Sequence, residues 1–383
     1  MFNIIITGFT SLLTDISSEM VYPLIPLYLA TLGTQPAILG LIEGFAESSA
    51  SILKVFSGTL SDRARRRKPL AILGYSGSTI GKLLLYLSQN WGLVFAGRMV
   101  DRIGKGLRVA PRDALIADCT TPGRRGRAFG LHRSMDTIGA VLGVLIAIYL
   151  TSQLGSNLTR SEFQQIFLLS LIPALLGVSI LFLARENKIE SCSAIQYRIT
   201  LKNLTPKLRH FLIVITFFAL GNSSNGFLLL RMKNIGWTTI SVLFLYFVYN
   251  LTYSLFAYPA GRLSDKIGRK RFLVIGYGLY GGVYLGFAFI KPESVSVIPY
   301  ILFAIYGLYS ALTEGQEKAL VADLAPEEHR ASFIGLHATL TSIGLLPASL
   351  IAGGLWSLLG PRAPFFWGGA LGLAAALGLV LFI

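Results

Sequence analysis

The sequence contains Gly58-Thr-Leu-Ser-Asp62-Arg-Ala-Arg-Arg-Arg67-Lys68 and, 203 residues later, Gly261-Arg-Leu-Ser-Asp265-Lys-Ile-Gly268-Arg269-Lys270-Arg271. Each copy closes a long apolar stretch and combines a glycine, an aspartate and a run of basic residues. A repeat of this length in a chain of 383 residues predicts two equivalent halves, with the function located where the halves meet.

The composition identifies the solvent of this chain as a lipid bilayer. It is 53% hydrophobic and 14% charged, with a mean hydropathy of +0.62. The net charge of +15 would suggest nucleic acid in a soluble protein, but the basic residues cluster in alternate connections, at 63–68, 124–127, 185–209 and 266–271. These clusters indicate cytoplasmic loops, which explains the charge without a nucleic-acid partner.

Turn signals and charges divide the chain into twelve spans of about 20 residues. We place them at 4–32, 37–61, 69–88, 91–119, 127–152, 164–184, 210–231, 239–261, 272–290, 296–325, 331–358 and 364–383. An even number of spans puts both termini in the cytoplasm of a multi-pass protein of the cytoplasmic (inner) membrane. The basic stretch 185–209 is the predicted linker between an N-terminal bundle, 1–184, and a C-terminal bundle, 210–383.

A second repeat supports two halves independently. Asp113-Ala-Leu-Ile-Ala-Asp118 recurs as Lys318-Ala-Leu-Val-Ala-Asp323, and Gly130-Leu-His132 recurs as Gly335-Leu-His337, both at an offset of 205. The matched positions include charged residues and histidine, so general apolar similarity does not explain them.

Over essentially its whole length the chain resembles the major facilitator superfamily of secondary transporters. The loop pattern is similar to that family's signature, Gly-x-Leu-x-Asp-Arg-x-Gly-Arg-Arg, and the second copy matches it almost fully, whereas Arg65 replaces a glycine in the first. The resemblance implies an all-α membrane fold of twelve transmembrane helices in two pseudo-symmetric six-helix bundles. It also implies that the loops act as conformational latches through Gly58, Asp62, Arg63, Gly261, Asp265, Gly268 and Arg269.

The residues of these loops also have a local interpretation. Glycine permits a tight turn, and aspartate is able to cap the following helix. An ordinary basic cytoplasmic loop would explain the arginines but not the paired glycine and aspartate.

Charged residues are unevenly distributed among the spans. Those of 164–184, 272–290 and 364–383 carry none, and 69–88 carries only Lys82, so these helices can face lipid. The first, second, fourth, fifth and tenth spans carry Asp15, Glu19, Glu43, Glu47, Lys54, Arg98, Asp101, Arg102, Lys105, Arg108, Arg112, Asp113, Arg133, Asp136, Glu314, Glu317 and Lys318. Each would cost about 2.5–3.5 kcal/mol at a lipid-exposed helix centre, so these side chains must face protein or a water-filled cavity.

The spacing of these charges predicts cavity-facing stripes. Asp15 and Glu19 are four residues apart, as are Glu43 and Glu47, and the fourth span carries a mostly basic ridge. Arg98 begins a segment that resembles the superfamily's fourth-span motif, whose arginine is linked to proton coupling. Asp101 and Arg102 stand where that motif has Gln and Gly.

The seventh span is interrupted by the polar stretch 221–226, which includes Asn222 and Asn225. Such interruptions point to a midplane binding site, although a kink or small-residue packing explains them equally well. The candidate residues of the substrate or proton pathway are Asp15, Glu19, Glu43, Glu47, Arg98, Asp101, Arg102, Arg108, Asp136, Asn222, Asn225 and Glu314. For each charged candidate, the alternative is a role in an ion-pair network that holds the helices together. For His132 and His337, a packing or hydrogen-bonding role is favoured over titration.

The predicted function is secondary transport of a small organic solute, anionic or zwitterionic, by alternating access with a proton or other coupling ion. Drug, metabolite or siderophore permeases and a transporter-like sensor are alternatives, and uniport, symport and antiport stay open. Gly104-Lys105-Gly106 lacks the spacing of a phosphate loop, and no catalytic or metal-binding constellation is present, so we expect neither an enzyme nor a cofactor. The expected partners are the solute, the coupling ion and the bilayer, and the expected working form is a monomer.

Overall fold

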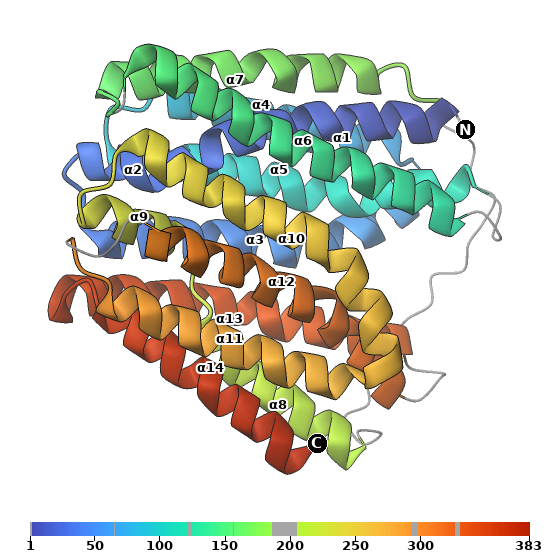
Figure 1. The fold of residues 1–383 in the computed structure, drawn as a ribbon. Coiled ribbons are helices and arrows are strands. Elements are labelled where there is room, and N and C mark those ends of the chain that lie inside the picture. The colour runs from blue at the N-terminus through green and yellow to red at the C-terminus, as the bar shows by residue number, and fades with distance from the viewer. Residues whose placement is uncertain are drawn as a thin grey trace. The chain divides into compact units, whose positions relative to one another are not determined.

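The computed structural model describes residues 2–64, 66–120, 125–155, 157–185, 205–292, 297–325 and 330–383. These residues form fourteen α-helices and one short 3-10 helix, with no strand among them (Figure 1). The all-α prediction is therefore confirmed.

Two of the twelve predicted spans are each divided in the structure. The first comprises α1 (Phe2–Val21), η1 (Tyr22–Leu24) and α2 (Ile25–Thr31), and the division coincides with Pro23 and Pro26. Proline lacks the backbone N–H that would continue a helical ladder. The seventh span comprises α8 (Pro206–Gly221) and α9 (Gly226–Asn234), which are separated by the polar stretch expected from the sequence.

Each of the other ten spans is one continuous helix. These are α3 (Pro36–Ala64), α4 (Lys68–Tyr86), α5 (Trp91–Asp118), α6 (Arg125–Leu154), α7 (Arg160–Leu181), α10 (Thr239–Ile267), α11 (Arg269–Phe289), α12 (Val297–Leu324), α13 (Arg330–Leu359) and α14 (Ala363–Phe382). Nine helical segments of the described chain are long and apolar enough to cross a membrane. The three long helices outside that set are α3, α4 and α5, which share the buried charges described below.

The structure divides into two compact units. The first contains residues 1–34, 45–195 and 238–243, and the second contains 35–44, 196–237 and 244–383. Helices α3 and α10 therefore change unit along their length. The predicted linker 185–209 lies mostly outside the described residues, and the predicted bundle boundaries stay a prediction.

In the first unit, α1 packs against α6 and α7, while α4 packs against α5 and α7. Glycines allow the closest of these approaches, because a β-carbon added to Gly104 of α5 would lie 2.5 Å from the carbonyl oxygen of Gly74 on α4. A β-carbon on Gly81 would lie 2.6 Å from the carbonyl oxygen of Gly97. Small residues at a helix interface allow this contact between membrane helices.

In the second unit, α11 packs against α12 and α14, and α8 packs against α13 and α14 (Figure 1). Aromatic side chains fill much of this unit. Phe218 of α8 stacks on Tyr277 of α11 at 4.2 Å between ring centroids, and Tyr280 stacks on Tyr284 at 4.1 Å. The rings bury a large apolar area and hold α8 against α11.

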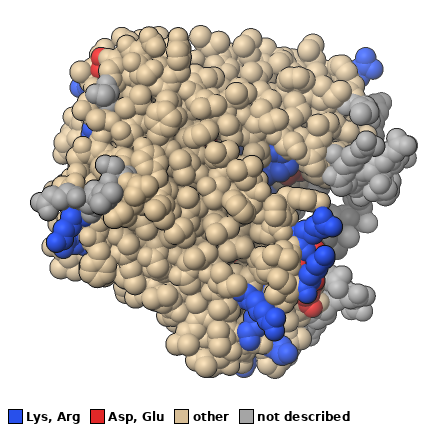
Figure 2. Space-filling model, in the orientation of Figure 1, with Lys and Arg blue, Asp and Glu red and all other residues tan. Residues whose placement is uncertain are grey.

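Large apolar side chains are exposed along the helices, as a lipid-facing surface requires. Examples are Phe56, Leu255 and Leu381, each more than 60% exposed. Most of the face drawn in Figure 2 carries no charged side chain, and the visible Lys and Arg residues gather mainly toward the helix ends.

Candidate functional site

Five charged side chains form a buried cluster in the first unit, which we call the α3–α5 ion cluster: Glu47, Lys82, Arg98, Asp101 and Arg102. Asp101 is its hub, with the Lys82 ammonium at 3.6 Å, the Arg98 guanidinium at 3.5 Å and the Arg102 guanidinium at 3.6 Å. Glu47 of α3 lies 3.3 Å from Arg102 and 3.8 Å from Arg98. Four of the candidate residues from the sequence therefore contact one another.

The glycine contacts between α4 and α5 position this cluster. Because the two backbones approach closely at Gly81 and Gly97, Lys82 on the next position of α4 reaches Asp101 across the interface. Lys82 is only 2% exposed, so the assignment of its helix to the lipid face is wrong at this residue. The close approach of α4 turns an apparent lipid-facing lysine into a partner of Asp101.

The ring of Tyr22 in η1 completes the cluster. The guanidinium carbons of Arg98 and Arg102 lie 5.2 and 5.9 Å from its centroid. Aromatic faces attract cations at this distance. The break between α1 and α2 thus places a neutral aromatic partner beside the two arginines.

Arg108 lies further along α5 and has neutral partners. Its side chain is 4% exposed, donates one hydrogen bond to Ser78 Oγ at 2.9 Å and lies over the ring of Tyr75 at 4.4 Å. Its Nε has no hydrogen-bond partner, and no carboxylate lies within 4 Å of its guanidinium among the described residues. Arg108 is therefore a buried cation without a direct ion-pair partner among the described residues, and the carboxylates of Asp15, Asp101 and Asp136 act on it only over longer distances.

The hydroxyl of Ser11 on α1 connects side chains from four helices. Its hydroxyl lies 2.9 Å from Tyr75 Oη and 3.0 Å from His132 Nε2, and it accepts a hydrogen bond from Arg112 at 3.1 Å. His132 Nδ1 in turn lies 3.5 Å from Asp136 Oδ2. The candidate Asp136 thus belongs to a polar chain that runs through α1, α4, α5 and α6.

The two acidic candidates of α1 differ in their surroundings. Asp15 is half-buried and makes no hydrogen bond or ion pair among the described residues, although it is close enough to interact electrostatically with Asp136 and Arg108. Glu19 packs on α6, where a β-carbon added to Gly143 would lie 2.9 Å from the Glu19 β-carbon. Asp15 is therefore a carboxylate that no ion pair fixes in its charged form.

In the second unit, the polar break between α8 and α9 is held by side chains from its neighbours. Tyr280 donates to the carbonyl oxygen of Gly221 at 2.7 Å, and Tyr306 donates to Asn225 Oδ1 at 2.8 Å. The hydroxyl of Ser224 donates to Glu43 Oε2 at 3.4 Å, within the part of α3 that belongs to this unit. Such partners are what non-helical backbone at membrane depth requires.

A small polar pocket of about 130 Å³ adjoins this break. It is lined by Ile215, Phe218, Ala219, Asn222, Glu317, Thr341, Ser342 and Leu345. Glu317 accepts a hydrogen bond from Tyr277 at 2.9 Å and lies 3.4 Å from His337 Nε2. Candidate Glu314 does not line this pocket; it is exposed and accepts a hydrogen bond from Tyr253 at 2.5 Å.

Each of the two repeated loops contains an arginine that forms an ion pair with an aspartate. In the second loop, Arg269 lies 3.4 Å from Asp265 and 3.0 Å from Asp323. In the first, Arg67 lies 3.4 Å from Asp118 and donates to Ser61 Oγ at 2.9 Å. In each half an arginine at the start of the helix after the loop therefore contacts an aspartate in the last turn of α5 or α12.

Comparison with known proteins decides the family. The family model described as Major Facilitator Superfamily matches residues 7–205 and 210–383. The chain belongs to the Major Facilitator Superfamily. As a member it is a multi-pass membrane transporter, and members of this superfamily are typically not enzymes.

Relatives and solved structures agree with this membership. An uncharacterized MFS-type transporter of Methanocaldococcus jannaschii is 39% identical over 389 residues, covering 100% of this chain and 94% of the relative. Multidrug resistance protein MdtH of Proteus mirabilis is 24% identical, covering 92% and 88% of the two chains. The nucleoside transporter NupG and a D-xylose-proton symporter share the fold with TM-scores of 0.80 and 0.76, at 13% and 17% identity, and the alignments cover 100% of this chain and 99% and 98% of theirs.

In the structure, Gly58, Gly261 and the two loop aspartates do not take the turn and helix-cap positions that the sequence suggested. Gly58 and Gly261 lie inside α3 and α10 rather than in turns. The helices that follow begin after Arg67 and Gly268, so neither aspartate caps them and that expectation is wrong. The side chains of Asp62 and Arg63, and residue 65, lie outside the described part of the structure.

Gly268 makes the turn in the second loop. Its φ of 104° is rarely accessible to residues with a β-carbon, and its N–H donates to the carbonyl oxygen of Ser264 at 2.9 Å. The glycine thus separates α10 from α11 and starts α11 directly at Arg269.

Gly268→Ala is expected to destabilise the purified protein by about 1–3 kcal/mol, because alanine would be strained at this φ. Gly278→Ala is the matched control, since Gly278 lies inside α11 with open space around its α-carbon. That change should be neutral or slightly stabilising. Thermal unfolding in detergent compares the two variants, and equal stability would contradict the role given to Gly268.

Three residues of these sites, Lys82, Glu317 and Arg67, are not among the candidate residues predicted from the sequence. Lys82 gives no pattern because it is a single lysine in an apolar helix, and the sequence does not distinguish Glu317 from its neighbour Glu314. Arg67 lies in a run of basic residues, where sequence cannot distinguish the one that forms an ion pair. The repeat itself supplied a usable signal, because Asp118 and Asp323 are matched positions.

Proposed function

We propose that this superfamily member is a secondary active transporter that moves a small anionic or zwitterionic organic solute across the cytoplasmic membrane by alternating access, coupled to protons. The observation that carries the proposal is Arg108, a buried guanidinium whose described partners are neutral. An unpaired cation inside a membrane protein is costly, and a solute carboxylate or phosphate would supply its missing partner.

The surroundings of Arg108 support an anionic group rather than a structural counter-ion. Arginine presents a planar fork of donors that matches the two oxygens of a carboxylate. Lys105 and Arg112 lie close enough to contribute to the same positive field, as their shared interaction with Asp15 indicates. The site therefore favours solutes with a negative group over neutral ones.

The Glu317 pocket supports a second candidate, a permease for an organic cation or a drug. The Glu317 carboxylate accepts a hydrogen bond from Tyr277, and the aromatic Phe218 lines the same pocket, an arrangement that suits an ammonium group. Among the relatives, MdtH of Proteus mirabilis is named as a multidrug resistance protein.

Asp15 is the carboxylate we favour as the proton carrier. Glu47 and Asp101 each lie within 4 Å of Arg98 and Arg102, so protonating either carboxylate would break ion pairs with buried cations. Asp15 can gain or lose a proton without breaking an ion pair among the described residues. Carboxylates that change protonation between the two access states are what proton coupling requires.

Asp15→Asn tests this assignment in proteoliposomes. We expect the variant to lose accumulation driven by an imposed pH gradient, by about tenfold or more, while solute exchange at equal concentrations on both sides persists. Asp15→Glu, which keeps the carboxylate, should retain part of the coupled transport. Full gradient-driven accumulation by Asp15→Asn would exclude Asp15 as the carrier.

We also propose that both termini face the cytoplasm, which rests on the alternation of basic connections along the chain. A monomer is sufficient for the proposed mechanism, because both members of the repeated pair lie in one chain. A transporter-like sensor would bind the solute without moving it, and flux measurements separate that alternative.

A further inference from the structure

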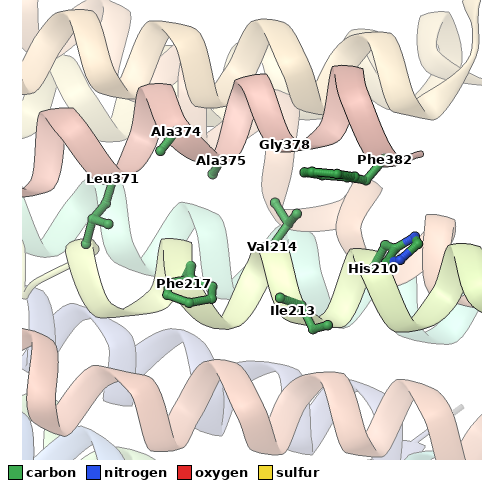
Figure 3. Close-up of a pocket in the computed structure, with 9 residues that line it drawn as sticks. All are labelled: His210, Ile213, Val214, Phe217, Leu371, Ala374, Ala375, Gly378 and Phe382. Carbon is green, nitrogen blue, oxygen red and sulfur yellow. The ribbon is translucent and has the colours of Figure 1, made fainter.

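An apolar groove runs along the side of α8 in the second unit (Figure 3). Its volume is about 390 Å³, and it is lined by His210, Ile213, Val214, Phe217, Leu371, Ala374, Ala375, Gly378 and Phe382. Of these nine residues only His210 has a polar side chain. Figure 3 shows α8 on one side and α14 on the other, with His210 and Phe382 together at one end.

A second groove of about 370 Å³ lies on the other side of α8. It is lined by Arg209, Leu212, Ile213, Thr216, Phe217, Leu336 and Leu340. Ile213 and Phe217 line both grooves, are one helical turn apart, and are 48% and 59% exposed. They form a ridge, which we call the α8 ridge, with one apolar groove on each side.

Each groove has a basic residue at the same end of the ridge. Arg209 lines the second groove and His210 lines the first, and these consecutive residues lie one turn before Ile213. Among the described residues, Arg209 has no carboxylate partner, and neither groove has an acidic residue in its lining. The shared end of the two grooves therefore carries positive charge.

Lys270 of α11 adds a further cation to this end. Its ammonium donates to the carbonyl oxygen of Val380 at 3.4 Å, while the ring of Phe382 lies 5.9 Å from the ring of His210. The last turn of α14 thus contacts both Lys270 and His210. Lys207, exposed in the first turn of α8, is close to the same end along the chain.

We propose that a single anionic diacyl phospholipid straddles the α8 ridge, with one acyl chain in each groove and its phosphate at Arg209 and His210. Two apolar grooves that share a ridge match the two chains of one lipid, whereas the transported solute needs several polar partners and these linings are polar only at Arg209, His210 and Thr216. The clustered cations favour a headgroup with net negative charge over a zwitterionic one. In the proposed topology this end faces the cytoplasmic leaflet, where anionic lipids attract basic residues.

The proposal is independent of the identity of the transported solute. Native mass spectrometry of the purified full-length protein, titrated with phosphatidylglycerol, phosphatidylcholine or lysophosphatidylglycerol, measures the binding of each lipid. We expect phosphatidylglycerol to bind about tenfold or more tightly than phosphatidylcholine, and more tightly than its single-chain form. Equal binding of the two diacyl lipids would overturn the anionic headgroup site.

Two variants separate the headgroup from the chains. Arg209→Gln combined with Lys270→Gln should abolish the preference for phosphatidylglycerol, while Lys291→Gln, a charge change beyond the opposite end of α11, should leave it intact. Ala374→Phe fills the first groove from an exposed position and should remove the advantage of two chains over one. Thermal unfolding verifies that each variant is folded. An unchanged headgroup preference in the double variant, or an unchanged chain preference in Ala374→Phe, would contradict the proposed pose.

Discussion

Asp101→Asn is expected to destabilise the protein by about 3–5 kcal/mol, the cost typical of removing one partner from a buried ion pair. Asp101 lies within 3.6 Å of Lys82, Arg98 and Arg102, so its neutralisation removes an ion pair from each of three buried cations. The effect should appear as a lower midpoint of thermal unfolding, followed by tryptophan fluorescence of the protein in detergent.

Asp113→Asn is the matched control for this experiment. Asp113 also pairs with an arginine, at 2.8 Å from Arg112, but its side chain is 42% exposed. Exposed pairs contribute about 0–1 kcal/mol, so this variant should unfold close to the wild-type midpoint. If Asp101→Asn were as stable as Asp113→Asn, the hub role of Asp101 in the α3–α5 ion cluster would be wrong.

Arg108→Gln is expected to reduce solute affinity by about 30-fold or more without destabilising the fold. Truncating one side of a buried charge pair typically costs about 2–5 kcal/mol in binding, and the proposed partner of Arg108 is the solute. In the solute-free protein Arg108 has no carboxylate partner among the described residues, so removing its charge relieves a cost instead of creating one. Binding is measured through the shift in unfolding midpoint as solutes of each charge class are added.

Arg98→Gln serves as the comparison, because we expect this variant to destabilise the fold. Arg98 is 2% exposed and pairs with both Glu47 and Asp101, so its loss should lower the stability of the protein even when no solute is present. Arg108→Lys keeps the charge but loses the planar fork, and an intermediate affinity is expected. A variant Arg108→Gln that binds every solute class as tightly as wild type would exclude Arg108 from the solute site.

The duplicated framework carries opposite charges at equivalent positions. Arg112 in the first half and Glu317 in the second are 205 residues apart, as are His132 and His337. In the first unit Arg112 and His132 meet at the hydroxyl of Ser11, and in the second Glu317 meets Tyr277 and His337 directly. Equivalent positions of the two halves thus carry a basic residue in the first unit and an acidic residue in the second.

The sequence predicted the helices well because their signals are local. Apolar length, proline and charged connections define each span, and the polar stretch at Asn222–Asn225 indicated where the seventh span breaks. The latch residues were predicted from a pattern of residue types, but that pattern does not show that Gly58 and Gly261 lie within helices. The same pattern of residue types is compatible with helix ends at different positions, so the pattern does not determine where the connecting turn lies.

The site was predictable only in outline. Charge in an apolar span shows that a side chain must be buried, but its partner is set by how closely two helices approach. Lys82 reaches Asp101 because glycines on α4 and α5 bring the backbones together, and that contact joins positions 19 residues apart. That Arg108 forms no direct ion pair with a described residue is likewise a property of the packed helices, since nearby carboxylates are plentiful in the sequence.

The most direct test of the central claim is solute flux in proteoliposomes that hold the wild-type protein under an imposed pH gradient. Labelled anionic, zwitterionic, cationic and neutral solutes are compared, with and without a protonophore that collapses the gradient. The account predicts that an anionic or zwitterionic solute crosses the membrane against its own gradient and that the protonophore stops this movement. Specific binding of such a solute with no flux of any class would contradict it and favour a sensor.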